Sequence, residues 1–429
     1  MRTGSDAMCQ MPPSQGLAKV YYVAALRARC GIIPRMNIAF VAPFGLAPKG
    51  TTRWRVLPLA RALAARGHSV RVLVPSWDRP QDAGRAWHEG SADVVSIPFP
   101  AALGKAAWPI LLARLLAEAR RGKSDVVHVF KPIGFSGAVA QAMLRLPAGE
   151  RPLVWADADD LETAWADARP AWQRRAIARQ ERGVLSRADG VTVASRALLH
   201  HVAEWRSATP VYLPNTSTLR PVDADEVPGR VVWYTRFLDI APDTAADIWA
   251  DIVQNTVGAG LRPAPTPSCP TLHVVGVGMG GEERAFAEAV RARGLDGTVV
   301  LRGYLEADSL AAELSAACVA ILPFADTPRN RYKCPARLAD LVALGVPVMA
   351  HAVGECPSYV VHGETGLLVA PGDDKGFAEA LVALLADAGL RRAMRAAARA
   401  HFARHFAPNA LAERLERAYA SALAPRGNP

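Results

Sequence analysis

The chain has 429 residues, of which 51% are hydrophobic and 21% are charged, and its formal net charge is +10 at pH 7. This is the composition of a globular protein, and the length suggests two or three domains with cores that need no disulfide support. The basic excess favours anionic partners, which are phosphorylated small molecules, nucleic acid or an acidic membrane face.

The six cysteines are scattered and form no CxxC pair. They argue against a disulfide framework or a structural zinc site and suit a reducing compartment. No uncharged apolar run reaches the roughly 18 residues of a transmembrane helix. The apolar region near the N-terminus is interrupted by Lys19, Arg27 and Arg29, unlike a signal peptide. We therefore expect a cytoplasmic protein.

Residues 1–35 show no sustained hydrophobic period, and we expect a poorly ordered N-terminal extension, with Met36 as an alternative start of the chain. From Met36 to residue 218, short apolar runs alternate with longer runs of helical spacing. The expected strands are 37–42, 68–74, 93–97, 125–130, 152–157, 190–195 and 211–214. The expected helices are 53–67, 105–121, 134–146 and 171–187.

Residues 215–229 are polar, contain Pro and Gly, and are expected to form a linker. The alternation then restarts. The expected strands are 230–236, 271–278, 298–303, 318–324, 346–350 and 366–370. The expected helices are 243–254, 282–293, 306–316, 334–344 and those that run to the end. The pattern predicts an α/β protein with two doubly wound, Rossmann-like domains that face a central cleft.

Glycines at positions 276, 278 and 281 form a GxGxxG pattern after a predicted strand and before a predicted helix. Such a loop lets the backbone approach a phosphate at a helix N-terminus. A dinucleotide site needs an acidic residue about 20 positions further on. The next strand ends on Arg302 instead, which would suit NADP only, so a nicotinamide enzyme is the weaker reading. A tight turn without a ligand is the other alternative.

The loop at 42–55 follows the first predicted strand of the first half. Gly45 and Gly50 allow a ligand to approach the backbone, and Lys49 and Arg53 supply positive charge. We expect this loop to face the cleft.

Three carboxylates, Asp157, Asp159 and Asp160, emerge from a predicted strand of the first half. The first two match the DxD motif with which single-domain glycosyltransferases hold a divalent metal and a nucleotide. Paired carboxylates also suit proton transfer or the binding of sugar hydroxyls. The alternative is helix capping or solvated loop charge. His128, in the preceding strand, and Lys131, just after it, are secondary candidates.

The stretch ALGVPVMAHAVGECPSYVVHGETGLLVAPGD at 343–373 is the most specific motif of the chain. It resembles the C-terminal signature of family 4 glycosyltransferases of the GT-B fold. Looser likenesses to the same family occur at 337–348, 231–237, 211–215, 188–199 and 38–70. The resemblance covers most of residues 36–405.

The resemblance implies a GT-B enzyme that transfers a sugar from a nucleoside-diphosphate donor with retention of configuration and without a metal. It implies an acceptor-side domain at 36–218 and a nucleotide-sugar-binding domain at 219–405, followed by a C-terminal helix at 406–429 that packs back on the first domain. The donor is a substrate, so no permanently bound cofactor is expected. The acceptor would be a saccharide or a lipid-linked saccharide in polysaccharide, glycolipid or glycoconjugate assembly.

The sequence also departs from the family pattern. The family has two glutamates eight positions apart, and the second aligns with Asp340, an acceptor for ribose hydroxyls. The first falls on Tyr332, which cannot act as a carboxylate, and Asp326 is a substitute if the loop is longer. The family often carries a histidine where Asp159 stands.

A family arginine aligns with Arg236, whereas the lysine that normally follows it is missing. Lys333 or Arg337 would then supply the second cation that stabilises the departing diphosphate. Asp159 and Asp160 would orient the acceptor hydroxyl or the sugar.

The predicted site has three parts and no metal ligand. The catalytic residues are Asp159, Asp160, Arg236 and Lys333. The donor-binding residues are Arg337, Asp340, Arg302, Gly303, Tyr304, Gly278, Gly354, Glu355 and Asp326. Of these, residues 302–304 would contact the base of the nucleotide. The acceptor-side loop residues are Gly45, Lys49, Gly50, Arg53 and His128.

Two other functions remain open, a catalytically degenerate binding or scaffold protein and a GT-B epimerase of nucleotide sugars. The basic helix at 171–187 would attract an anionic membrane at the inner face or a lipid-phosphate acceptor, although a solvated surface helix is slightly favoured. No nucleic-acid-binding motif accompanies the charge, so no nucleic-acid partner is expected.

Overall fold

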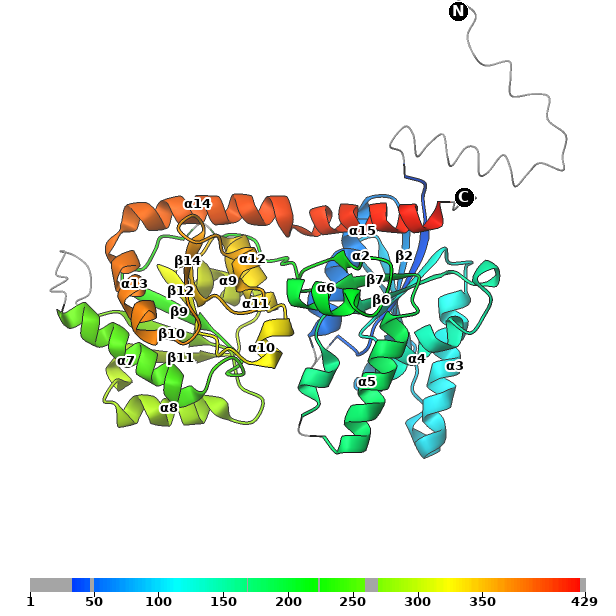
Figure 1. Cartoon of the computed structure of the whole chain (residues 1–429), viewed down its shortest axis with the longest axis horizontal. Coiled ribbons are helices and arrows are strands. Elements are labelled where there is room, and N and C mark those ends of the chain that lie inside the picture. The colour runs from blue at the N-terminus through cyan, green and yellow to red at the C-terminus, as the bar shows by residue number, and fades with distance from the viewer. Residues whose placement is uncertain (1–32, 47–49, 168, 223, 259–268, 425–429) are drawn as a thin grey trace, which may run out of the picture.

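The computed structural model describes residues 33–46, 50–167, 169–222, 224–258 and 269–424. These residues form two α/β domains that lie side by side, each with one mostly parallel sheet covered by helices on both faces (Figure 1). This confirms the predicted GT-B-like architecture of two Rossmann-like units. None of the described helices is both long enough and apolar enough to cross a membrane.

The first sheet has the strand order β3-β4-β2-β1-β5-β6-β7-β8. Its strands are rich in Val and Ala and buried on both faces, as parallel sheets under two helix layers are. The strands are β1 (Asn37–Val41), β2 (Ser69–Pro75), β3 (Ala86–Glu89), β4 (Ala92–Ile97), β5 (Val126–Phe130), β6 (Leu153–Ala158), β7 (Gly190–Val193) and β8 (Val211–Tyr212). Only β3 is antiparallel, and it was not predicted because its four residues carry no apolar run.

Helices cover this sheet on both sides, and the main ones lie close to their predicted positions, except for the last of them, which was not predicted. They are α2 (Leu57–Ala65), α3 (Ala107–Arg120), α4 (Gly134–Met143), α5 (Ala171–Leu185) and α6 (Arg196–Ala203). The shorter turns are η3 (Thr52–Val56), η4 (Pro80–Asp82), η5 (Ala101–Ala106), η6 (Ala148–Glu150) and η7 (Glu162–Trp165). The π-helical turn η3 leads directly into α2, and π-turns are frequent at functional sites.

The second sheet has the order β11-β10-β9-β12-β13-β14 and is parallel throughout its described strands. The strands are β9 (Arg230–Tyr234), β10 (Thr271–Val275), β11 (Val299–Gly303), β12 (Val319–Leu322), β13 (Val348–His351) and β14 (Gly366–Val369). The helices are α7 (Pro242–Gly258), α8 (Glu282–Ala292), η8 (Asp296–Thr298), α9 (Ala307–Ser315), α10 (Pro328–Tyr332), α11 (Ala336–Leu344), α12 (Cys356–Tyr359) and α13 (Asp374–Ala386).

The strand order reverses beside the first strand of each sheet. In the first sheet β1 lies between β2 and β5, and in the second β9 lies between β10 and β12. Ligands of doubly wound sheets bind beyond the carboxyl ends of the strands at such switch points. The loops after β5 and β9 are therefore the places where a ligand is expected.

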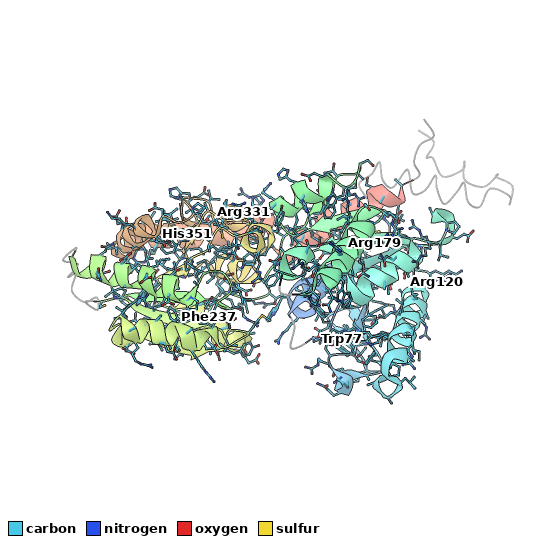
Figure 2. All side chains as sticks on the ribbon, turned by 60° about the horizontal axis from the view of Figure 1, so that its bottom comes forward. Trp77, Arg120, Arg179, Phe237, Arg331 and His351 are labelled. Atoms are coloured by element: carbon cyan, nitrogen blue, oxygen red, sulfur yellow. The ribbon has the colours of Figure 1, made fainter. Side chains whose placement is uncertain are left out.

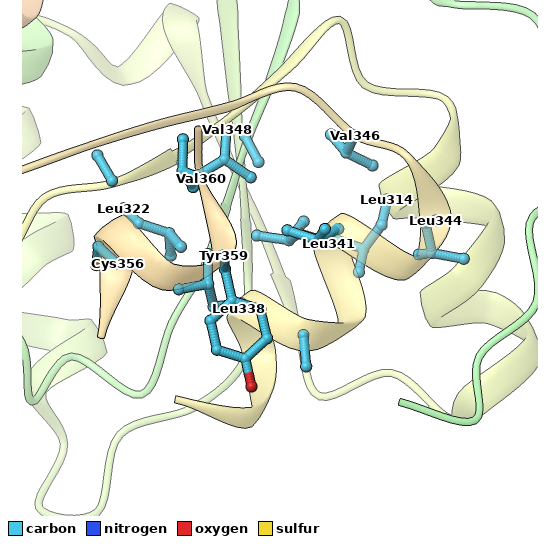
Figure 3. Close-up of a cluster of buried hydrophobic side chains, with 14 of the residues drawn as sticks. Leu314, Leu322, Leu338, Leu341, Leu344, Val346, Val348, Cys356, Tyr359 and Val360 are labelled. Atoms are coloured by element: carbon cyan, nitrogen blue, oxygen red, sulfur yellow. The ribbon is translucent and has the colours of Figure 1, made fainter. Parts of the chain in front are cut away.

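The stretch at 343–373 builds the far side of the second sheet. Helix α11 ends at Gly345, whose φ of 76° suits a left-handed cap, and β13, α12 and β14 follow. Leu338 and Leu341 of α11 pack with Val348 of β13 and Tyr359 of α12 in one apolar cluster (Figure 3). The signature motif therefore forms a large part of the second core.

The two C-terminal helices, α14 (Ala388–His405) and α15 (Pro408–Leu423), lie almost in line along one side of both domains (Figure 1). Helix α14 packs on α11 of the second domain, whereas α15 packs on α2 of the first. Tyr419 of α15 lies in the first core, where its hydroxyl is 2.6 Å from Nδ1 of His128. The end of the chain thus links the two domains.

Candidate active site

A buried lysine gathers three carboxylates at the carboxyl ends of β5 and β6. The Nζ atom of Lys131 lies 2.6 Å from Glu162, 2.9 Å from Asp159 and 3.5 Å from Asp160. Lys131 has a φ of 64°, an unusual backbone conformation for a lysine that often marks a functional site. Asp159 and Asp160, both predicted as catalytic, are therefore held together at the switch point of the first sheet.

The charged groups of this cluster shift one another's pKa values. Burial lowers the pKa of Lys131, but Asp159, Glu162 and Asp160 outweigh it, so this pKa lies above its ordinary value and the lysine is protonated. Burial raises the pKa of Asp160 to about 7, partly offset by Lys131. Asp160 therefore exchanges a proton near neutral pH, as a general base or acid must.

A buried ion pair lies beneath this cluster. Arg55 of η3 donates from Nε and Nη2 to the two carboxylate oxygens of Asp157, at 2.7 and 2.6 Å. Thr192 also donates to Asp157, at 2.5 Å. Asp157 is thus fully engaged inside the first domain and does not pair with Asp159 as a DxD metal motif would. Among the described residues, no group of three His, Cys, Asp or Glu side chains could hold a metal ion.

The second domain presents a cationic cluster. Asp239, in the loop after β9, accepts from Nζ of Lys333 and, at 2.5 Å, from Arg337. Burial raises the pKa of Asp239, but the two cations outweigh it and hold the pKa below its ordinary value. The buried Nε of Arg337 has no hydrogen-bond partner among the described residues. Both candidates for the second cation beside Arg236 therefore lie together here, with a carboxylate already bound to them.

Four side chains act electrostatically on Tyr234 at the end of β9. Burial raises the pKa of its phenol, Asp340 and Tyr304 raise it further, and Arg337 and Arg236 oppose this effect. Three of these residues were predicted to bind the donor, and Arg236 was predicted as catalytic. Phe237, beside Arg236, has a φ of 57°, so the backbone turns sharply there; Figure 2 shows Phe237 on this domain.

Asp340 lies under this cluster and is buried. Its Oδ1 accepts from the hydroxyl of Ser217 at 2.5 Å. Burial raises its pKa to about 7, although Ser217 and Arg337 oppose the rise. Asp340 is therefore partly protonated at neutral pH.

The two clusters face each other across the domain boundary. Lys333 of the second domain acts electrostatically on Asp160 of the first. Arg53 of η3 approaches Glu306 of the second domain to 4.0 Å. A pocket of about 410 Å³ lies beside Asp239, between the loops that follow β9 and β12, and Asp167 of the first domain contributes to its wall. The pocket therefore lies at the boundary between the two domains, and Asp239 is the one member of the two clusters among its described lining residues.

Some predicted donor residues lie elsewhere. Glu355 is buried against the first domain, where it accepts from the Tyr212 hydroxyl and from the backbone N–H of Arg196 at 2.8 Å. Gly354 has a φ of 55°, and a Cβ there would lie 2.3 Å from the backbone oxygen of Asn330. This turn therefore contacts the first domain at the domain boundary, and a contact of Glu355 with the donor stays a prediction.

The glycine loop after β10 is closed by its own helix. The N–H of Gly278 donates to Glu283 at 2.9 Å, and that of Gly280 donates to Glu282 at 2.7 Å. A Cβ on Gly276 would lie 2.0 Å from the backbone oxygen of Thr235, so close packing requires this glycine. The loop is therefore better described as a tight turn without a ligand than as a phosphate site, because the glutamates already accept hydrogen bonds from its backbone N–H groups.

Three other predicted residues are already engaged. Arg302 on β11 pairs with Glu313 at 3.2 Å. Asp326 is exposed and forms a bidentate pair with Arg331. His128 is fully buried in β5 between Tyr419 and Thr192, so it belongs to the core and not to an acceptor-side loop.

The predicted acceptor-side loop is only partly described. Lys49 lies outside the described residues. The N–H of Gly45 donates to Asp78 at 2.9 Å, and the carbonyl of Gly50 accepts from Trp54 at 2.8 Å. These bonds hold the loop ahead of η3.

Tyr332, which stands where the family has a glutamate, packs across the domain boundary. Its ring centroid lies 5.3 Å from that of His201 on α6, and its carbonyl accepts from the Ser195 hydroxyl at 2.7 Å. The tyrosine therefore fastens α10 to the first domain.

Several site residues carried no clear signal in the sequence. Asp239 lies in the segment where the family lysine is missing, and Tyr234 and Ser217 lie in unremarkable apolar and polar runs. Glu162 closely follows the predicted carboxylates, so a search for acids near Lys131 would have found it.

The comparisons with known proteins agree with this geometry. A family model described as "Glycosyl transferase 4-like domain" matches residues 50–216, and one described as "Glycosyl transferases group 1" matches residues 251–387. The chain belongs to the family 4 glycosyltransferases. The sequence resemblance is thereby confirmed. No curated protein sequence matches the chain significantly.

Solved glycosyltransferases share the fold at low identity. Sucrose-phosphate synthase from Thermosynechococcus elongatus is 22% identical, with a TM-score of 0.69 over 91% of this chain and 100% of that one. Anabaena HepE, solved in complex with UDP-glucose, is 16% identical, with a TM-score of 0.64 over 90% and 100%. WaaG, a glycosyltransferase involved in lipopolysaccharide biosynthesis, is 16% identical, with a TM-score of 0.59 over 89% and 99%.

Proposed function

We propose that this family 4 glycosyltransferase moves a sugar from a nucleoside-diphosphate donor to a hydroxyl acceptor, with retention of configuration and without a metal ion. The observation that carries the proposal is the pair of facing clusters. Cations gather at the end of β9, and carboxylates with raised pKa values gather at the ends of β5 and β6. A diphosphate needs the first set, and a sugar with its acceptor hydroxyl needs the second.

The cationic cluster suits a departing diphosphate. Cleavage at the anomeric carbon builds negative charge on the diphosphate, and Arg236, Lys333 and Arg337 would stabilise it. The buried Nε of Arg337 lacks a partner among the described residues, so a phosphate oxygen would satisfy it. Such stabilisation does not require a metal ion.

The acceptor side is built for handling a proton. Asp160 has a pKa of about 7, and Lys131 holds it beside Asp159. A carboxylate with this pKa would bind an acceptor hydroxyl and take its proton at neutral pH. We assign Asp159 to orienting the sugar or the acceptor.

Asp340 and Tyr304 complete the donor site in this proposal. Asp340 would bind the ribose hydroxyls of the donor, and residues 302–304 would contact its nucleotide base. HepE was crystallised with UDP and with UDP-glucose, which makes uridine nucleotides the first donors to test. We infer a role in polysaccharide or glycoconjugate assembly at the cytoplasmic side of a membrane.

A membrane contact is supported by α5. Trp172 at its start is 68% exposed, and the basic residues Arg174, Arg175 and Arg179 follow on the same helix (Figure 2 labels Arg179). An exposed tryptophan beside arginines suits an anionic interface. The proposal predicts that the protein sediments with phosphatidylglycerol vesicles. Less protein should sediment at high salt, and the Trp172→Ala variant should sediment less than the wild type. Equal sedimentation of both proteins would contradict the contact.

The scaffold alternative also has an observation in its favour. Asp239 already pairs with both Lys333 and Arg337, and Tyr332 replaces a family glutamate. A protein in which this pairing is permanent would bind nucleotide weakly and turn nothing over.

A thermal-shift panel of nucleoside diphosphates followed by a turnover assay tests the proposal. One class of nucleotide should raise the melting temperature of the wild-type protein. The same nucleotide should raise the melting temperatures of Arg236→Gln and Asp340→Asn by a smaller amount. The matching nucleotide sugars should then release nucleoside diphosphate only with an acceptor present. Isomerised donor without transfer would identify an epimerase, and binding without turnover across an acceptor panel would favour the scaffold.

A further inference from the structure

A second pocket lies at the domain junction, where α14 passes into α15 (Figure 1). Its volume is about 280 Å³, and its walls come from both domains and from the two C-terminal helices. The first domain contributes α6 and β8, and the second contributes α12. The lining residues are Arg196, Tyr212, Ser358, His401, His405, Phe406 and Arg414.

This junction pocket is strongly basic. Four of its seven lining side chains are Arg or His, and none is a carboxylate. Within the described ranges, neither Arg196 nor Arg414 forms an ion pair. Burial lowers the pKa of His405, and His401, Arg404 and Arg414 lower it further. Burial and Arg196 also lower the pKa of Arg414. The two arginines therefore have no carboxylate partner in the pocket wall, and the Glu355 carboxylate beneath it binds Tyr212 and the Arg196 backbone instead.

The two guanidinium groups are held in place. Those of Arg196 and Arg414 lie 4.9 and 5.8 Å from the ring centroid of Tyr212. Arg196 donates from Nε to the Ser358 hydroxyl at 3.1 Å, and Arg414 donates from Nη1 to the Tyr212 carbonyl at 2.9 Å. Glu355 anchors Tyr212 and the Arg196 backbone from beneath.

Most donors of this pocket are still available. A guanidinium has five N–H groups, and the described contacts of Arg196 and Arg414 each use one of them. Two pre-positioned arginines form the arrangement that binds phosphate oxygens well. The rings of Tyr212 and Phe406 add an apolar wall beside them.

We propose that the junction pocket is a binding site for a phosphate-bearing anion distinct from the sugar donor. Its phosphate is bound by Arg196 and Arg414, with His401 and His405 beside it. A volume equal to about nine water molecules, at roughly 30 Å³ each, holds one phosphate group with a small substituent. Because the walls come from both domains, a bound anion would also fasten the domains to each other.

Calorimetric titration tests this site directly. Pyrophosphate and glycerol 3-phosphate are titrated at constant ionic strength into the wild-type protein, R196Q/R414Q and R417Q. Arg417 is the matched control, because it lies on the same helix, exposed and paired with Glu413. Binding should weaken at least tenfold in R196Q/R414Q and stay unchanged in R417Q. Unchanged binding in R196Q/R414Q, or an equal loss in R417Q, would overturn the proposal.

Two further variants separate this site from the donor site and from misfolding. R236Q lies in the proposed donor cluster, so an anion bound only there would be lost in R236Q and kept in R196Q/R414Q, which refutes the junction site. R196Q alone replaces an exposed helix residue, so it should retain the wild-type melting temperature and still weaken binding.

The source of the phosphate is decided with vesicles. Glycerol 3-phosphate represents a free ester, and phosphatidylglycerol vesicles, with phosphatidylcholine as reference, represent a lipid headgroup. Vesicle binding that R196Q/R414Q abolishes, without binding of the free ester, assigns the phosphate to a lipid. Binding of the free ester alone assigns it to a soluble metabolite. Binding of neither probe by the wild-type protein overturns the proposal.

Discussion

Replacing Asp239 by Asn should lower stability and at the same time increase the stabilisation by nucleotide. Asp239 is 2% exposed and pairs with two cations, so removal of its charge leaves the buried Lys333 and the half-buried Arg337 beside each other. Breaking a buried ion pair from one side costs about 3–5 kcal/mol. For a domain of this size that lowers the melting temperature by roughly 6–20 °C.

A nucleoside diphosphate should reverse much of this loss. In the wild-type protein the phosphate must share the two cations with Asp239, whereas in Asp239→Asn it becomes their only anion. Scanning calorimetry with and without saturating nucleotide should therefore give a larger upward shift for the variant than for the wild type.

The matched control is Asp326→Asn, which removes an exposed Asp–Arg pair from the neighbouring loop. Its melting temperature and its nucleotide shift should equal those of the wild type, since exposed ion pairs contribute little. A smaller nucleotide shift for Asp239→Asn than for the wild type would refute the reasoning, because the diphosphate would then not bind where Asp239 lies.

Two other substitutions test the site and its support. The folded protein keeps a proton on Asp340 up to about pH 7, whereas in the unfolded chain this carboxyl ionises near its ordinary pKa of 3.8, so stability falls as pH rises between these values. Asp340→Asn removes this penalty. Between pH 4 and pH 8, its free energy of unfolding in urea should therefore rise by up to about 4 kcal/mol relative to that of the wild type. A difference between the two proteins that does not change with pH would contradict the assignment. Tyr419→Phe leaves the buried His128 Nδ1 without its 2.6 Å partner and should cost about 1–3 kcal/mol, measured by the same unfolding assay. Tyr304→Phe, at a tyrosine that is 60% exposed, is its control, and equal effects would rule out the buried bond as the cause.

The sequence was a good guide wherever buried strands and their turns decide the structure. The apolar runs at β5 and β6 and the motif around α11 and β13 fold as predicted, because burial on both faces favours runs of mostly apolar residues there. Asp159 and Asp160 lie at the cleft for the same reason, since they directly follow a central strand.

Contacts between segments that are far apart in the sequence could not be predicted in this way. Glu355 was expected at the donor, yet it binds Tyr212, which is 143 positions away in the sequence. Asp239 binds Lys333, which is 94 positions away in the sequence. Neither the residue types nor the local hydrophobic period predicts that pairing. His128 looked like a strand-end candidate until Tyr419 of the last helix covered it. Such contacts depend on how distant segments pack, which local patterns do not encode.

The central claim is that the cations at the end of β9 bind the diphosphate of a nucleotide sugar. The most direct measurement is the calorimetric dissociation constant of the nucleoside diphosphate for the wild type, Arg236→Gln and the control Arg331→Gln. Arg236 is exposed at the cluster, whereas Arg331 is paired with Asp326. A charge-assisted hydrogen bond contributes about 1.5–3 kcal/mol, so Arg236→Gln should bind at least tenfold more weakly while Arg331→Gln binds like the wild type. Equal affinity of all three proteins would contradict the account.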